Sequence, residues 1–291
     1  MEHLSEIVIG ILMGTIARII MLKEDYRQYP SFPDAFLIHI TIGFVAAALG
    51  AVALPALLEN NFVAVTFLVL AIQQFRDVRK IEKNDLLALE NVELVKRGEA
   101  YINGIAKSFE ARNYIVIITS LVTTGTLEFM KTSYPILEIG LAVILGIMTP
   151  YLIDKWTKDQ VVGDVAEVKK VTLKFDGHNL LVDGQYISNQ ALDNAKDRIL
   201  EEGIGVVIKP YNHAGDISLA NYGQRQAIAH EAARILGVKR YIETRRNFNT
   251  GEVIMMIVPM RKDVEALLKV IKQVPLLEST KREKHIQIGA D

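Results

Sequence analysis

The sequence predicts an α-helical membrane bundle of about five transmembrane helices, followed by a small cytosolic α/β (α+β) domain. Half of the 291 residues are hydrophobic, a share that is ordinary for a soluble protein. Their distribution is not ordinary, because long apolar runs fill residues 1–154 and only 12 of the 33 lysine and arginine residues fall there. We therefore expect a transmembrane helical domain over 1–154, a cytosolic domain over 155–280 and a polar tail over 281–291.

Five apolar runs are candidates for membrane-spanning helices, which need about 20 mostly apolar residues. They cover residues 7–22, 35–58, 62–75, 114–130 and 136–153. The run 62–75 is the shortest, and its length leaves open whether it crosses fully. The first run follows acidic residues instead of a basic segment, and no small-residue cleavage site comes after it, so we expect it to be retained.

The lysine and arginine residues between the runs predict the orientation, because they favour the cytosolic side. The connection 76–113 carries eight of them, whereas the connection 59–61 carries none. Five spans would give a multi-pass protein of the cell membrane with its N-terminus outside and its C-terminal domain in the cytosol. If 62–75 does not cross, the N-terminus moves inside. In both cases 76–113 and the C-terminal domain share a side.

The connection 76–113 is amphipathic, and its last part continues directly into the apolar run 114–130. Apolar side chains recur there at helical spacing, namely at Ile102, Ile105, Ala106 and Phe109. Such a helix either lies in the lipid headgroup region or packs on the C-terminal domain. Gly98 and Gly104 each weaken it by about 1 kcal/mol relative to alanine. They indicate a close backbone approach or a bend, or they are tolerated glycines.

Three blocks of this sequence resemble one protein family. They are YINGIA at 101–106, DYRQYPSFPD at 25–34 and AVTFLVLAIQQFRDVRK at 64–80. The first resembles the hexapeptide that names the YIEGIA family, membrane proteins of endospore-forming bacteria, and the three blocks look like that family in the same order. The resemblance implies a sporulation-associated membrane protein and supplies no catalytic residues. Asn103 replaces the glutamate of the hexapeptide, so a role that needs this carboxylate does not transfer.

Polar and aromatic residues near the cytosolic ends of the predicted spans form a candidate binding surface. Aromatic side chains at the edge of a span usually anchor it in the interface, but here arginine and glutamine accompany them. We expect three groups to meet and form one polar surface: Arg27, Gln28 and Tyr29; Gln73, Gln74 and Arg76; Tyr101 and Gly104.

Charged residues within or beside the spans are candidates for intramembrane polar sites. These are Arg18, Glu128 and Glu138. The long stem of Arg18 favours an anchor that reaches the headgroups over a role in a solute pathway. Glu128 and Glu138 bracket a short connection that contains Lys131, which favours a water-exposed hairpin tip over a shared proton or cation site.

Small and hydroxyl side chains predict how the helices pack. Gly10 and Gly14 form a GxxxG pattern in the first span, and small residues line the second span at Gly43, Ala47 and Gly50. Threonines follow one stripe of the fourth span, at 119, 123 and 126. We expect their hydroxyls to bond across helices or to carbonyls of their own helix.

Residues 155–280 alternate strand and helix patterns, which predicts an α/β domain. Strands are expected near 171–175, 180–182, 204–209, 240–246 and 252–260. Helices are expected from a cap at Ser188 or Asn189 to Gly203, over 219–236 and over 263–274. The stretch VIMMIVP at 253–259 is apolar on both faces, which predicts a central strand.

No catalytic, metal or cofactor site is predicted. The chain has no cysteine, and four candidate ligands lack the i, i+4 spacing of a helical metal site: His213, Asp216, His230 and Glu231. A basic strand at Lys239, Arg240, Arg245 and Arg246 favours contact with anionic lipid or neighbouring acids over nucleic-acid binding, because the net charge of the domain is small.

The leading hypothesis is a non-enzymatic scaffold whose cytosolic domain binds a protein partner or a second copy of the chain, with the lipid bilayer around its N-terminal half. The alternative is a transporter or channel subunit that moves a small solute or ion past the hairpin acids or the threonines. A third hypothesis is a membrane-bound enzyme that acts on a lipid or a nucleotide.

Overall fold

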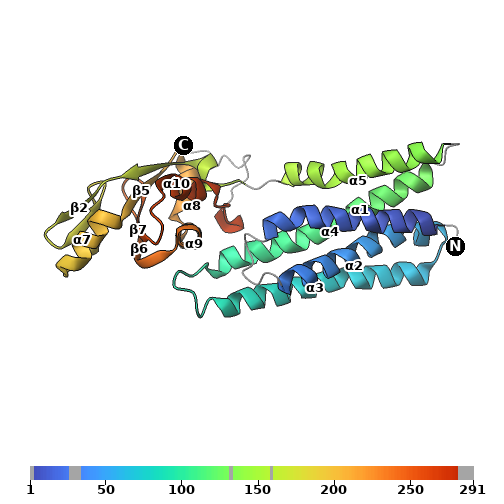
Figure 1. Cartoon of the computed structure of the whole chain (residues 1–291), viewed down its shortest axis with the longest axis horizontal. Coiled ribbons are helices and arrows are strands. Elements are labelled where there is room, and N and C mark those ends of the chain that lie inside the picture. The colour runs from blue at the N-terminus through green and yellow to red at the C-terminus, as the bar shows by residue number, and fades with distance from the viewer. Residues whose placement is uncertain (1–2, 26–33, 131–133, 158–159, 281–291) are drawn as a thin grey trace, which may run out of the picture. The chain divides into compact units, whose positions relative to one another are not determined.

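The computed structural model describes residues 3–25, 34–130, 134–157 and 160–280 (Figure 1). The chain forms two compact units. The helical unit comprises residues 1–85 and 105–158, and the α/β unit comprises residues 86–104 and 159–291. Residues 86–104 therefore belong with the C-terminal part of the chain, although the sequence pattern groups them with the membrane domain.

Five long helices run through the described part of residues 1–157: α1 Leu4–Asp25, α2 Asp34–Leu58, α3 Phe62–Leu89, α4 Glu99–Phe129 and α5 Pro135–Thr157. Among the described helices, three contain stretches long and apolar enough to cross a membrane, namely Leu4–Leu22, Phe36–Leu58 and Pro135–Thr157. They indicate a membrane-associated protein. α4 is one continuous helix of 31 residues, and its first residues, 99–104, belong to the α/β unit.

Helices α1, α2 and α4 pack closely through small side chains. Gly14 of α1 has no room for a Cβ atom, because Ala47 of α2 and Ser120 of α4 lie against it. The carbonyl oxygen of Gly10 accepts a hydrogen bond of 2.8 Å from the Ser120 hydroxyl. Gly50 of α2 lies equally close to the backbone of α4. The predicted GxxxG contact and the small-residue face of the second helix are confirmed.

The hydroxyls of the threonine stripe form hydrogen bonds within α4. Thr119, Thr123 and Thr126 each donate to the carbonyl oxygen four residues earlier, over 2.8, 2.8 and 2.7 Å. Internal bonding of this kind satisfies buried hydroxyls without a partner from outside the helix. The prediction that these hydroxyls bond within the bundle is confirmed.

The α/β unit contains two antiparallel sheets. The four-stranded sheet has the order β1 Ala166–Val171, β5 Ile204–Pro210, β7 Val253–Pro259 and β6 Val238–Arg246. The three-stranded sheet has the order β2 Leu173–Asp176, β3 Asn179–Val182 and β4 Gln185–Asn189. The helices are α6 Val162–Val165, α7 Asp193–Glu202, α8 His213–Ala220, α9 Tyr222–Leu236 and α10 Val264–Gln273, followed by a 3-10 turn at Glu278–Thr280.

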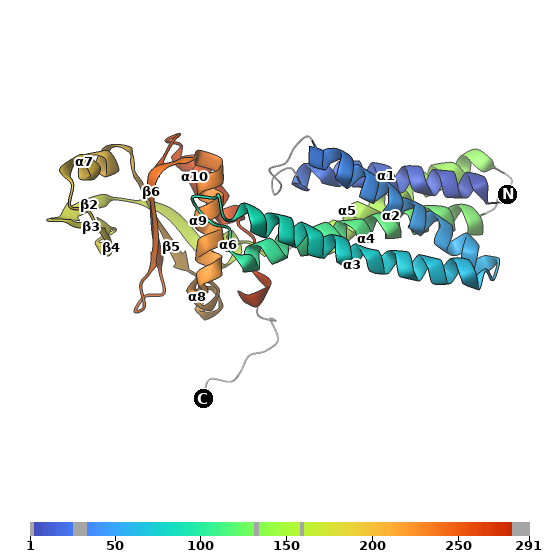
Figure 2. The same cartoon turned by 90° about the horizontal axis from the view of Figure 1, so that it is seen from below.

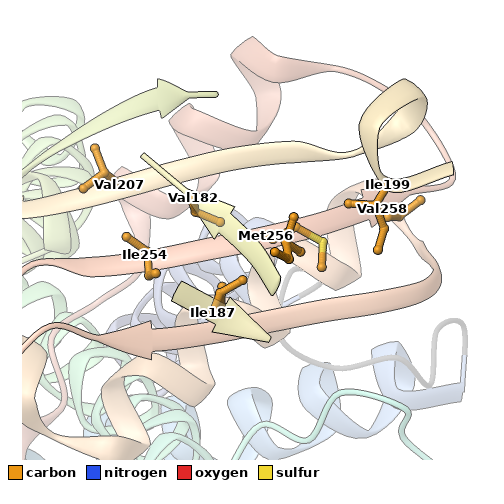
Figure 3. Packing of buried hydrophobic residues seen from close by; sticks show 8 residues of the cluster. Val182, Ile187, Ile199, Val207, Ile254, Met256 and Val258 are labelled. Atoms are coloured by element: carbon orange, nitrogen blue, oxygen red, sulfur yellow. The ribbon is translucent and has the colours of Figure 1, made fainter. Parts of the chain in front are cut away.

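Strand β7 is the centre of the core. All of its residues are buried, and it pairs with β5 on one side and β6 on the other, which confirms the predicted central strand. Ile254, Met256 and Val258 face the three-stranded sheet and α7 and join one apolar cluster (Figure 3). The alternate residues face the opposite side of the sheet, where α9 contacts β6 and β7. Figure 2 shows α9 and α10 on that side and β2, β3, β4 and α7 on the other.

Strand β4 overturns one prediction of a helix start. The sequence pattern predicts a helix cap at Ser188 or Asn189, but these residues end β4. They remain extended because β4 pairs with β3 over this stretch, from Val182 opposite Gln185 to Asn179 opposite Asn189. Helix α7 begins only at residue 193 and ends before Gly203 as predicted.

Two other elements are divided where the sequence predicts one. The strand expected near 171–175 is the end of β1 and the whole of β2, which join different sheets. The helix expected over 219–236 is divided between α8 and α9, because the Asn221 side chain caps α9 by accepting the backbone N–H of Gln224 over 3.2 Å. Asparagine at such a position is a strong helix start.

Candidate functional site: the clasp between residues 86–104 and helix α9

The segment between α3 and α4 forms a tight loop that is closed by Glu90. Its carboxylate accepts the backbone N–H groups of Arg97 and Gly98, each over 2.9 Å. Gly98 has a φ of +87°, and the side chain of Gln226 in α9 lies against it. Only glycine adopts this conformation without strain. Of the alternatives that the sequence leaves open, Gly98 therefore shows the close backbone approach. A Cβ atom added to Gly104 would meet nothing within 4 Å, so Gly104 is a tolerated glycine.

Tyr101, in the first turn of α4, is hydrogen-bonded to α9. Its side chain is buried, and its hydroxyl donates to a carboxylate oxygen of Glu231 over 2.9 Å. Arg234 holds the same carboxylate through two nitrogens, at 3.2 and 2.7 Å. Burial raises the pKa of Tyr101, and the Glu231 carboxylate raises it further. The phenol therefore remains a hydrogen-bond donor.

His230, the neighbour of Glu231, binds the loop through both ring nitrogens. Arg97 Nε donates to His230 Nε2 over 3.1 Å, and His230 Nδ1 lies 2.6 Å from the carbonyl oxygen of Val95. An arginine can only donate, so Nε2 must be the acceptor and Nδ1 must carry the proton. This is the neutral imidazole. Burial lowers the pKa of His230, the Arg97 charge also lowers it, and the Val95 carbonyl opposes them.

Arg97 is 4% exposed, which is unusual for a charged side chain. Its guanidinium lies 3.5 Å from a carboxylate oxygen of Glu93. We name the group formed by Arg97, Tyr101, His230 and Glu231 the clasp, because it fastens the segment that leads into α4 to helix α9.

The hexapeptide YINGIA therefore has a structural role. Tyr101 closes the clasp, and the side chains of Ile102, Ile105 and Ala106 are buried along one face of α4. Asn103 and Gly104 are half-buried. The sequence alone leaves open whether this helix lies among lipid headgroups or packs on the C-terminal domain. Its first turn packs on α9 of that domain.

Comparison with known proteins assigns the chain to a family. The family model of the YIEGIA protein matches residues 6–286. The chain belongs to the YIEGIA family. It is 39% identical over 288 residues to the uncharacterized protein YphB of Bacillus subtilis (strain 168), covering 97% of this chain and 95% of the relative. No solved structure matches.

The residues predicted to form one polar surface belong to both units of this YIEGIA protein. Gln73, Gln74 and Arg76 are exposed on α3, in the helical unit. Tyr101 is buried in the clasp, so its side chain is not part of an exposed surface. The block 27–29 lies outside the described residues. The meeting of the three groups stays a prediction.

Arg18 is not at the surface of the helical unit. It is fully buried, and its guanidinium carbon lies 5.1 Å from the centre of the Phe109 ring. Its Nη2 lies 3.4 Å from Nδ1 of His39, and Gly43 leaves room for its aliphatic stem. The anchor at the headgroups favoured by the sequence is therefore wrong for this side chain, which turns towards α2 and α4.

Glu128 pairs with a residue that the sequence pattern does not single out. His3 Nδ1 lies 2.8 Å from its carboxylate, and His3 Nε2 lies 3.8 Å from the carboxylate of Glu59. Glu138 is in the first turn of α5, and Lys131 lies outside the described residues. Within the described part of the chain, no group of three or more His, Asp or Glu side chains could hold a metal ion.

We predict that Tyr101→Phe loosens the clasp, because it removes one hydrogen bond while keeping the ring. A typical buried hydrogen bond contributes about 0.5–1.5 kcal/mol. Hydrogen exchange of the full-length protein in detergent should show faster exchange of the amides of residues 97–101. Tyr222→Phe is the matched control, because that tyrosine is 71% exposed. Equal exchange in both variants would contradict the assignment of the Tyr101 hydroxyl.

Proposed function

We propose that this protein is a sporulation-associated, multi-pass membrane scaffold without enzymatic activity, whose cytosolic α/β unit binds a protein partner or a second copy of the chain. The clasp is the observation that carries this proposal. The hexapeptide that names the family contributes a buried packing face and a hydrogen bond to α9. These residues therefore connect a folded domain to a long helix.

The proposed topology has five spans, an outer N-terminus and a cytosolic C-terminal domain. The basic connection 76–113 supports this orientation. The exposed side of α3 supports a crossing by that helix, because the side chains of Phe62, Val63 and Phe67 are 74%, 82% and 69% exposed. Large apolar side chains in contact with water are costly, whereas contact with lipid removes that cost.

We predict that single cysteines report this topology, since the chain has none of its own. In intact cells, a membrane-impermeant maleimide should label Glu59→Cys and leave Val92→Cys unlabelled. Both side chains are well exposed in the structure, at 60% for Glu59 and 83% for Val92. Labelling of both positions only after the membrane is opened would contradict the crossing by α3. Labelling of Val92→Cys in intact cells would contradict a cytosolic α/β unit.

An exposed aromatic patch on the α/β unit supports partner binding. It comprises Tyr222, Arg225, Arg246 and Phe248. The ring of Phe248 is 84% exposed and lies 5.8 Å from the Arg246 guanidinium, and Tyr222 has the same distance to Arg225. Burial lowers the pKa of Arg225, and the nearby charge of Arg246 lowers it further, so the two pairs are neighbours. Aromatic and arginine side chains are enriched in protein interfaces.

The basic strand predicted from the sequence is occupied largely by contacts within the unit. Lys239 pairs with Glu202 over 2.5 Å and Arg246 with Asp216 over 2.6 Å. The Arg245 guanidinium lies 4.8 Å from the ring centre of Tyr186. Two of these residues therefore pair with neighbouring acids, one of the two alternatives that the sequence favours. The exposed rings of Tyr222 and Phe248 are the better candidate for a partner surface.

We predict that the double variant Tyr222→Ser and Phe248→Ser loses its partner or its self-association. Purification of the full-length protein in mild detergent, followed by light scattering and identification of bound protein, measures both. Leu192→Ser is the matched control, because Leu192 is 72% exposed and lies outside the patch. A wild-type protein that is monomeric and binds no protein would contradict the scaffold, and an unaffected double variant would contradict the patch.

A further inference from the structure

Protonation of His230 would change its Nε2 atom from a hydrogen-bond acceptor into a donor. In the neutral ring, Nε2 accepts from Arg97 Nε over 3.1 Å and Nδ1 faces the carbonyl oxygen of Val95. In the imidazolium both nitrogens carry hydrogen. The hydrogen on Nε2 would then face the N–H of Arg97. Two donors and two positive charges would be opposed inside a buried contact.

We propose that the clasp is a pH-dependent contact, in which protonation of His230 releases the segment 93–97 from helix α9. The proposal goes beyond a scaffold role, because it gives the segment between α3 and α4 two states. In the closed state Arg97 is buried against the neutral ring. In the open state both the imidazolium and the guanidinium reach water, where their charges are solvated and screened.

The groups around His230 determine the direction of the response. From the loop, Arg97 and the Val95 carbonyl contact the ring, and Glu93 lies beside Arg97. From α9, Glu231 follows directly in sequence, held by Arg234 and by Tyr101 of α4. The two carboxylates favour the imidazolium, whereas burial and the arginine oppose it. Burial and the Arg97 charge together have the larger effect, so the pKa of His230 is lowered in the closed state.

A lowered pKa in the closed state means that the closed state is favoured at high pH. The clasp is fully stabilised above the ordinary histidine pKa of about 6.5, and this stabilisation is lost as the pH falls towards the lower pKa of the closed state. Between those two pKa values, the ratio of open to closed molecules rises by up to tenfold for each unit by which the pH falls. Mild acidification therefore favours the open state of the clasp.

The local structure allows such an opening without unfolding of the domain. Glu90 holds the amides of Arg97 and Gly98 within the loop. Release from α9 exposes these two bonds to water, so that they open more often while the rest of the domain stays folded. The Tyr101 hydroxyl keeps its bond to Glu231, because the burial that raises its pKa keeps it protonated. The first turn of α4 thus stays attached while the preceding segment moves.

Hydrogen exchange of the full-length protein in detergent at pH 7.5 and pH 5.5 tests the proposal. After correction for the intrinsic effect of pH, exchange in residues 93–98 should rise several-fold to tenfold at pH 5.5. Exchange in the buried strand 253–258 should not change, which separates local release from unfolding. No local rise in the wild-type protein would overturn the proposal without any variant.

His230→Gln supplies the second arm, because glutamine can accept from Arg97 and cannot take up a proton in this range. Its exchange in residues 93–98 should be low at both pH values. His213→Gln is the matched control, since it removes an exposed histidine and should behave as the wild type. A pH response that persists in His230→Gln, or that disappears in His213→Gln, would assign the effect to another group and overturn the proposal.

Discussion

The docking of the segment between α3 and α4 on helix α9 depends on the hydrogen bond between Arg97 and neutral His230. It joins two residues that are 133 positions apart in the chain. Because the imidazole is held on its other side by the Val95 carbonyl, the ring is fixed in one tautomer. Arginine can then be buried without losing its hydrogen bond. The segment between α3 and α4 becomes part of the α/β unit for this reason.

Helix α4 meets two different requirements along its length. Its first turn contributes Tyr101 to the clasp, whereas its later turns pack against the glycines of α1 and α2. Threonine and serine hydroxyls in those later turns bond to carbonyl oxygens, so the helix is buried without unsatisfied hydroxyls at Thr119, Ser120 and Thr123. One continuous helix therefore has a polar attachment at its start and a small-residue interface further on.

The features that could be predicted from the sequence are those that depend on neighbours along the chain. Apolar runs and the GxxxG contact depend on local composition and spacing. The central strand was also predictable, because VIMMIVP is apolar at every position except for its final proline. The two-residue turn at 183–184 has positive φ at both positions, as the Asp-Gly pair indicates.

The clasp could not be predicted, because its partners come from distant segments. In the sequence, His230 and Glu231 are recognisable only as possible metal ligands, and Arg97 only as part of a basic connection. The one available signal was Gly98, which indicated a close backbone approach without naming the partner. The prediction for Arg18 was wrong for a related reason. Its burial depends on Gly43 and Phe109 in other helices, and a long stem alone does not determine the direction in which it points.

The first turn of α4 is docked on α9 beside the clasp, and a disulfide between the two helices tests this most directly. A Cβ atom on Gly223 would lie 3.6 Å from Cβ of Ala100, within the range of about 3.5–4.5 Å that a disulfide requires. In the otherwise cysteine-free full-length protein, the double variant Ala100→Cys and Gly223→Cys should oxidise to an intramolecular bond, seen as a linked peptide by mass spectrometry. Two thiols that stay free and react with maleimide in the folded protein would contradict the account.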